Sequence, residues 1–117
     1  MAANDLLLVD VETDGGVAVI HCNGELDVSV CGDLQAVIER VATPSLSLLR
    51  IDTSGLSFMD SSGLHCLVET ERRCHQHGTR LEVIPSRPVT RLLKIAGVAQ
   101  RFADSAPAGS LIDAECH

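Results

Sequence analysis

Aromatic side chains are almost absent from this chain of 117 residues, which has no Trp or Tyr and only two Phe residues, Phe58 and Phe102. The chain therefore lacks the aromatic platforms on which single-stranded bases stack. Sixteen acidic residues against nine basic ones give a formal net charge of −7, which repels phosphate backbones. We therefore expect no nucleic-acid partner. Hydrophobic residues make up 45% of the chain and must build an aliphatic core.

Long apolar runs are also missing, since the longest are tetrads such as residues 6–9 and 17–20. A membrane helix needs about 20 such residues, so no membrane association is expected. Residues 1–5 contain no basic stretch ahead of an apolar one, which excludes a visible signal peptide. Because a typical domain has roughly 100–150 residues, we expect a single soluble, cytoplasmic domain that spans residues 1–117.

The five cysteines are odd in number and contain no Cys-x-x-Cys pair, so the sequence supports neither a thioredoxin-like motif nor a zinc ribbon. In a reducing cytosol we expect Cys22 and Cys74 to be buried, free thiols. Helical spacing places Cys66 on the polar side of a predicted helix, Cys31 in a first helical turn and Cys116 in the tail. Cys31, Cys66 and Cys116 are therefore the candidate redox thiols. No metal site and no cofactor are expected.

Short segments change hydrophobic period about every dozen residues, which predicts alternating strands and helices. An initial hairpin turns at residues 13–16, and the later strands should run parallel in a mixed α/β sheet. The predicted strands are residues 6–11, 17–22, 46–52 and 81–84, and the predicted helices are one capped by Ser29 and stopped at residues 43–44, one over 61–77, one with Pro88 in its first turn, and a short one within 107–115.

Right-handed crossovers would bring the loops after Cys22 and Asp52 to the same carboxyl edge of the sheet, where ligands and partners usually bind. The first loop contains Gly-Glu-Leu-Asp at residues 24–27, and the second contains Met-Asp-Ser-Ser-Gly-Leu at residues 59–64. The simplest interpretation is that the Asp and Ser residues only cap a helix. Alternatively, a phosphate on Ser61 would lie on a helix N-terminus and act on a docked partner.

These two stretches resemble the bacterial anti-sigma factor antagonists, which belong to the sulfate transporter and anti-sigma factor antagonist (STAS) domains. The resemblance is carried by residues 24–27 and by Ile-Asp-Thr-Ser-Gly-Leu-Ser-Phe-Met-Asp-Ser-Ser-Gly-Leu at residues 51–64, and it continues through residues 89–93, 97–98 and 101–102. It implies a single STAS domain of the α/β class, with a mixed four- to five-stranded sheet and helices packed largely on one face. Arg50 departs from the pattern, because it interrupts an apolar strand.

The resemblance also implies a function that is regulatory and not enzymatic. In the family, the unphosphorylated antagonist binds an anti-sigma factor that is also a serine kinase, and so frees a sigma factor. Phosphorylation of the serine after the aspartate, here Ser61 with Ser62 as second candidate, ends that binding, and a metal-dependent serine phosphatase resets it. The implied partner-binding residues are Glu25, Asp27, Met59, Asp60, Ser61, Ser62, Gly63 and Leu64.

Two alternatives remain open at the level of sequence. The chain could be a STAS interaction module of another assembly, such as an ABC transport complex or a stress-signalling scaffold. It could also be an antagonist whose affinity is modulated by thiol oxidation.

Overall fold

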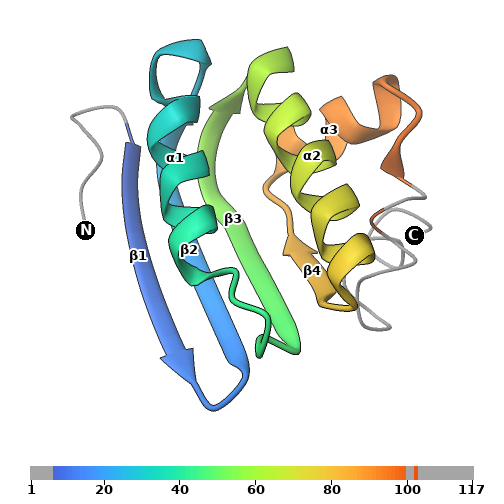
Figure 1. Ribbon diagram of the computed structural model, residues 1–117. Helices are drawn as coiled ribbons and strands as arrows, with labels where there is room; N and C mark the ends of the chain where they lie inside the picture. The colour runs from blue at the N-terminus through green and yellow to red at the C-terminus, as the bar shows by residue number, and fades with distance from the viewer. Residues whose placement is uncertain (1–6, 100–101, 103–117) are drawn as a thin grey trace.

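The computed structural model describes residues 7–99 and 102, which form a four-stranded mixed sheet and three helices. Its elements are β1 (Leu7–Asp14), β2 (Val17–Leu26), α1 (Val28–Val41), β3 (Leu48–Met59), α2 (Ser61–His77), β4 (Arg80–Ile84) and α3 (Arg87–Ile95). The strands lie in the order β1-β2-β3-β4; β1 and β2 are antiparallel, and the other neighbours are parallel. Helices α1 and α2 lie side by side over one face of the sheet (Figure 1). The predicted α/β class and mixed sheet are confirmed.

Strands β2 and β3 extend beyond their predicted ends and stay paired there. The sequence predicts that β2 stops at residues 23–24 and that residues 53–59 form a loop, but Leu26 still pairs with Met59. The pairing tolerates this polar, glycine-rich stretch because the register shifts twice, between His21 and Asn23 and between Gly24 and Glu25. The segments ahead of α1 and α2 are therefore strand ends and not loops.

The helices begin and end where local signals place them. Helix α2 spans the predicted residues exactly, and Gly78 closes it in the left-handed conformation at φ 73°. Helix α3 has Pro88 in its first turn and ends before Gly97 at φ 75°. The short helix predicted within residues 107–115 lies outside the described residues. No helix in the described part of the chain is long and apolar enough to span a membrane.

The core lies between the sheet and the two helices, and it is aliphatic as predicted. Alternate residues of β3 point into it, and Leu49, Ile51 and Thr53 are fully buried. Leu34 of α1 and Leu67 of α2 are fully buried from the opposite side. Burial of the hydrophobic side chains among these, at roughly 1.5–3 kcal/mol each, is the main force that holds the helices on the sheet.

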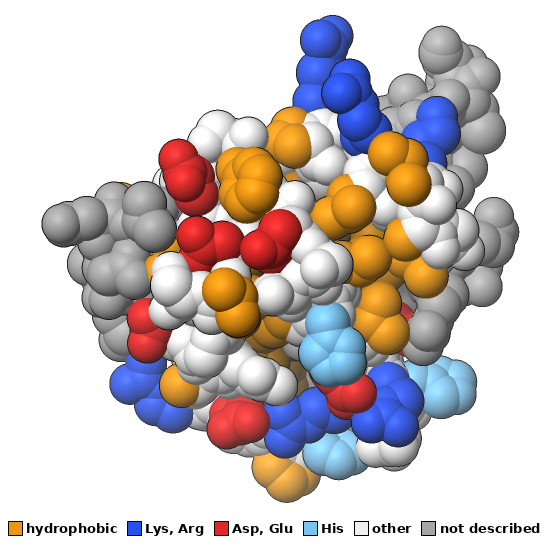
Figure 2. All heavy atoms as spheres, turned by 90° about the horizontal axis from the view of Figure 1, so that it is seen from above, with side chains coloured by type: hydrophobic (Ala, Val, Ile, Leu, Met, Phe, Trp, Pro, Cys, Tyr) orange, Lys and Arg blue, Asp and Glu red, His pale blue; other side chains and the backbone are white. Residues whose placement is uncertain are grey.

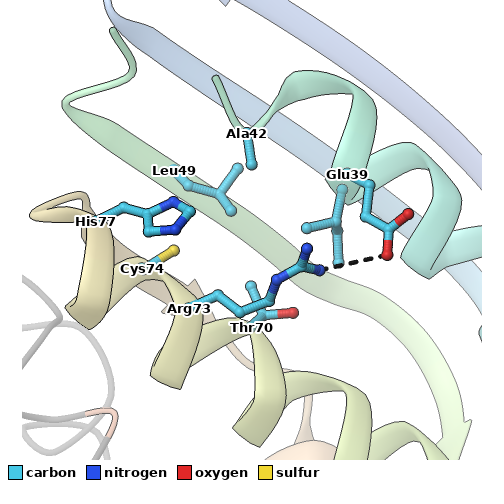
Figure 3. A pocket seen from close by; sticks show the side chains of 8 residues that line it. Glu39, Ala42, Leu49, Thr70, Arg73, Cys74 and His77 are labelled. Atoms are coloured by element: carbon cyan, nitrogen blue, oxygen red, sulfur yellow. Dashed lines mark hydrogen bonds and ion pairs between the residues drawn. The ribbon is translucent and has the colours of Figure 1, made fainter. Parts of the chain in front are cut away.

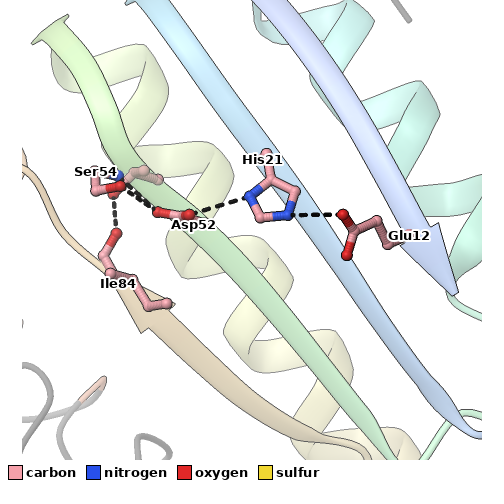
Figure 4. A network of polar contacts seen from close by, with 6 residues as sticks. Glu12, His21, Asp52, Ser54 and Ile84 are labelled. Atoms are coloured by element: carbon pink, nitrogen blue, oxygen red, sulfur yellow. Dashed lines mark hydrogen bonds and ion pairs between the residues drawn. The ribbon is translucent and has the colours of Figure 1, made fainter. Parts of the chain in front are cut away.

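The other face of the sheet carries a chain of paired polar side chains (Figure 4). His21 of β2 lies between two carboxylates, with its Nδ1 3.1 Å from Asp52 Oδ2 and its Nε2 3.7 Å from Glu12 Oε2. Burial raises the pKa of the Asp52 carboxyl, but hydrogen bonds from the Ser54 hydroxyl and backbone N–H and from His21 outweigh it, so the pKa lies below its ordinary value. Asp52 is therefore ionised at neutral pH.

Arg50, which interrupts the apolar strand in the sequence, lies on this polar face. Its Nε donates to Glu82 Oε1 of β4 at 2.6 Å, and the two residues are direct partners in the parallel register. The Glu82 side chain is only 7% exposed, so the guanidinium neutralises a largely buried carboxylate. The departure from the apolar pattern is thus a cross-strand ion pair.

Candidate functional site

Helices α1 and α2 begin next to each other at the edge where β2 and β3 end (Figure 1). Asp27 is the N-cap of α1: its Oδ1 accepts from the Ser29 N–H at 2.9 Å and from the Ser29 hydroxyl at 2.6 Å. The prediction that Ser29 is the cap is wrong. Because β2 continues to Leu26, the helix starts at Val28, and the cap falls on the residue between them.

Asp60 is the N-cap of α2, as predicted. Its Oδ1 accepts from the backbone N–H of Ser62 at 2.9 Å and of Gly63 at 3.2 Å. Its own N–H donates to the Leu26 carbonyl at 3.3 Å, which joins the start of α2 to the end of β2. The cap therefore sets the position of Ser61 relative to α1.

Ser61 is the first residue of α2 and is exposed to solvent. Its hydroxyl makes no hydrogen bond to any residue that the structure describes, whereas the Ser29 hydroxyl is bound to Asp27. Ser62 is partly buried and its N–H is bound to Asp60. Of the two candidate serines, Ser61 is the better presented to another protein.

Gly63 allows α2 to start in close contact with both strand ends. A Cβ at this position would lie 2.5 Å from Met59 Cγ and 3.0 Å from two side-chain carbons of Leu26. Met59 and Gly63 are both buried. The sequence places these two residues in the partner-binding set, but in the structure they support the surface from below and do not face solvent.

Two exposed hydrophobic residues stand beside the acidic ones, and the sequence did not single them out. Val28, the first residue of α1, is 74% exposed, and Phe58, which pairs with Glu25 in the sheet, is 46% exposed. Seen from above, acidic and hydrophobic side chains alternate over this end of the molecule (Figure 2). We call this surface the docking face and define it as Glu25, Asp27, Val28, Phe58, Asp60, Ser61, Ser62 and Leu64.

An exposed apolar group with charged neighbours is typical of a surface that binds another protein. No sequence signal marks Phe58, because the sequence predicts a loop over residues 53–59. The strand also does not alternate there, since Ser57 and Phe58 are both exposed between buried neighbours. The signal for Val28 is its position directly after a capping residue, where a side chain has no preceding turn to pack against.

Cys66 is buried and only 3% exposed, so its predicted place on the polar side of α2 is wrong. Helix α2 packs against both α1 and the sheet, which buries a broader strip than the apolar residues alone indicate. Thr70 is buried on the same strip, and its hydroxyl donates to the Cys66 carbonyl at 2.8 Å. Burial raises the pKa of the Cys66 thiol to about 11.

The remaining cysteines follow the predictions more closely. Cys22 and Cys74 are buried as expected, and burial raises their pKa values to about 12 and about 11. Cys31 is partly exposed below the docking face; burial and the charges of Asp60 and Asp27 raise its pKa. Cys116 lies outside the described residues. Cys66 is therefore not accessible enough to serve as a redox thiol in the thiol-oxidation hypothesis.

We expect iodoacetamide at pH 8 to alkylate Cys31 well before Cys22, Cys66 and Cys74. A rise in pKa from 9.0 to about 11 lowers the thiolate fraction about a hundredfold, and burial blocks access as well. Peptide-level mass spectrometry over a time course measures the order, and the protein unfolded in urea serves as the control in which all thiols react. Alkylation of Cys66 as fast as Cys31 would contradict the buried position of the Cys66 side chain on α2.

A shallow hollow lies between the carboxyl-terminal halves of α1 and α2 (Figure 3). Arg73 of α2 reaches across it to Glu39 of α1, with Nη1 3.4 Å from Oε2, and Cys74 and His77 line it. Its volume is about 40 Å³, room for a water or two, whereas ligand pockets usually have about 300–1,000 Å³. Within the described residues, no group of three or more His, Cys, Asp or Glu side chains could hold a metal ion.

Known proteins are similar to this chain over most of its length. The STAS domain family model matches residues 9–109. The anti-sigma-F factor antagonist RsfB of Mycobacterium tuberculosis is 33% identical over 91 residues, which cover 78% of this chain and 74% of RsfB. An anti-sigma factor antagonist from Mycobacterium paratuberculosis superposes with a TM-score of 0.74 at 29% identity, with 87% of each chain covered. Unphosphorylated SpoIIAA gives a TM-score of 0.68 at 25% identity, with 77% and 81% covered.

Proposed function

This chain belongs to the anti-sigma factor antagonists of the STAS domain family, and we propose that its docking face is a binding site switched by phosphorylation of Ser61. With Ser61 unmodified, the face binds an anti-sigma factor that is also a serine kinase, and a sigma factor is released. Phosphorylated Ser61 ends the binding, and a metal-dependent serine phosphatase restores it. RsfB and SpoIIAA are both anti-sigma factor antagonists, which agrees with this role.

The observation that carries the proposal is the Ser61 hydroxyl, which is exposed directly after the capping residue Asp60 and bonds to no residue that the structure describes. A phosphate there would lie at the N-terminus of α2, where the helix dipole stabilises an anion by about 0.3–1 kcal/mol. It would also bring a charge of about −1.5 to −2 close to Asp60. In the free protein, solvent screens the repulsion between the phosphate and the Asp60 carboxylate. These opposing effects are small, so the fold survives phosphorylation.

A docked partner would respond much more strongly. Binding removes water from the docking face, so the added charge is no longer screened and must be desolvated. The unmodified face already carries Glu25, Asp27 and Asp60, so the partner should present basic groups to them and apolar groups to Val28 and Phe58. The proposed switch thus acts on the interface and leaves the domain intact.

The test is phosphosite mass spectrometry of the protein after incubation with ATP and each candidate anti-sigma kinase encoded in the same genome. We expect one added phosphoryl group, located on Ser61, from at least one kinase. Ser61→Ala should abolish the modification and Ser62→Ala should retain it. Modification of Ser62 alone, or of neither serine by any candidate, would overturn the proposal.

A further inference from the structure

Helix α3 carries a stripe of positive charge on its exposed side. Arg87, Arg91 and Lys94 recur at i, i+4 and i+7 and are all exposed, while Val89 and Leu93 are fully buried on the other side. Three of the chain's nine basic residues thus lie on one helix of nine residues, in a protein of net charge −7. We call these three residues the basic stripe.

Arg87 and Arg91 differ from the other arginines of the protein. Among the arginines that the structure describes, only these two make no ion pair or hydrogen bond with a described residue. The paired ones are Arg50 with Glu82, Arg72 with Glu69 and Arg73 with Glu39, and Arg40 and Arg80 are also engaged. Two exposed guanidinium groups that pair with no described residue are notable in a chain with sixteen acidic side chains.

Helix stability accounts for Lys94, which lies in the last turn where the helix dipole favours a cation, but not for Arg87 and Arg91. Arg87 is the first residue of α3, where the positive end of the helix dipole disfavours a cation by about 0.3–1 kcal/mol. Arg87 and Arg91 are four residues apart, and like charges at that spacing repel by about 0.2–0.5 kcal/mol. Arg87 and Arg91 therefore slightly weaken the helix that carries them.

The end of α3 carries an exposed apolar side chain next to the basic stripe. Ile95 is 75% exposed, the highest value among the large hydrophobic residues of the described chain. Gly97 adopts φ 75°, and the Val98 N–H donates to the Leu93 carbonyl at 3.0 Å, which closes the helix in a defined way. The basic stripe and Ile95 are thus presented from a fixed position.

Helix α3 packs against β3, the strand that ends at the docking face. Seen from above, a group of Lys and Arg side chains stands at one edge of the molecule, acidic side chains stand at another, and hydrophobic side chains lie between them (Figure 2). We infer that α3 is a second docking element for the partner of the docking face, and that the basic stripe binds carboxylates of an acidic segment of that anti-sigma factor. This inference rests on the proposed function.

The two charge clusters together would select the partner. A protein that fits must be basic opposite Asp27 and Asp60 and acidic opposite the basic stripe, and a partner with the reverse pattern would meet like charges at both places. Arginine suits this task because its planar guanidinium binds a carboxylate through two parallel hydrogen bonds. Phosphorylation of Ser61 would add negative charge to the docking face and leave the charge of the basic stripe unchanged.

The test compares the binding of charge-reversed variants to the anti-sigma kinase that phosphorylates Ser61, by isothermal titration calorimetry with unphosphorylated protein. We expect the double variant Arg87→Glu, Arg91→Glu to bind at least about tenfold more weakly, because repulsion replaces attraction at two contacts. The matched control Arg72→Glu, Arg73→Glu makes the same change in net charge on α2 and should alter the affinity less than about threefold. The thermal midpoint of the α3 variant should not fall, since Glu at the first helical position is favourable.

The outcomes separate this inference from the proposed function. If the α3 variant binds like the parent while Ser61→Asp weakens binding, the role of α3 is overturned and the switch stands. If no anti-sigma kinase modifies Ser61, both fail. If the unmodified protein is dimeric by light scattering and the α3 variant is monomeric, a second copy occupies the basic stripe, and the inference is wrong.

Discussion

Ser61→Asp is expected to weaken binding to the anti-sigma kinase by at least about a hundredfold, a change of about 2.7 kcal/mol in binding free energy. The new carboxylate would stand beside Asp60 on the exposed first turn of α2 and become buried against the partner. A like charge or an unpaired charge enclosed in an interface costs several kcal/mol. The same change on the free protein alters stability little, because it lies at a helix N-terminus in water.

Two variants show whether the loss depends on charge at this position. Ser61→Ala keeps the face uncharged and should bind like the parent, yet it cannot be switched off by ATP. Ser45→Asp adds the same charge at an exposed position after the carboxyl-terminal end of α1, and it should leave the affinity unchanged. Calorimetric titration measures all three. Equal affinity for Ser61→Asp and Ser61→Ala would mean that Ser61 does not control the interface.

Gly63→Ala is expected to lower the free energy of unfolding by about 1–3 kcal/mol, the usual effect of an additional methyl group in a packed core. The added Cβ would lie 2.5 Å from Met59 Cγ and 3.0 Å from Leu26, and both side chains are buried. The start of α2 must then move away from the strand ends. Because Ser61 and Asp60 move with it, partner affinity should fall together with stability.

Gly32→Ala is the matched control for that substitution. Gly32 also lies in the first turns of a helix, but a Cβ there would meet nothing within 4 Å. This variant should gain about 0.5–1 kcal/mol, since alanine is the better helix former. Urea unfolding of the two variants and the parent gives the comparison. If Gly63→Ala is as stable as Gly32→Ala, the close contact between α2 and the strand ends does not exist in solution.

A second substitution identifies the origin of the effect. Met59→Ala removes the side chain that the new methyl group would meet first. In the double variant with Gly63→Ala, the loss in free energy of unfolding should be smaller than the sum of the losses in the two single variants, because the methyl group fills part of the space that methionine leaves. Strict additivity would show that the contact with Met59 is not the source of the strain.

The features that the sequence determined by itself are those encoded within a few residues. The limits of α2 follow from Asp60 before it and Gly78 after it, and Pro88 marks the start of α3. The change of period from strands to helices indicated a mixed sheet with α1 and α2 close to its carboxyl edge. The Asp-Ser-Ser-Gly motif located the candidate switch. Each of these signals depends on backbone geometry that a short segment carries wherever it lies.

The tertiary structure decided what depends on how elements meet. Cys66 appeared to lie on a polar helix side, but contact with both α1 and the sheet buries it. Strands β2 and β3 continue past their apolar runs, since parallel pairing satisfies backbone groups that sequence patterns assign to loops. Because β2 is longer than predicted, the N-cap of α1 is Asp27 and not the predicted Ser29.

The same reason explains why the docking face and the basic stripe were visible only in three dimensions. Burial, exposure and pairing are properties of neighbours that lie far apart in the chain. Phe58 is 46% exposed although it is paired with Glu25 in the sheet, and Gly63 is required because the side chains of Met59 and Leu26 lie close to it. Arg87 and Arg91 look like ordinary surface charges in the sequence, and only the structure shows that neither pairs with a residue in its described part, whereas other arginines do.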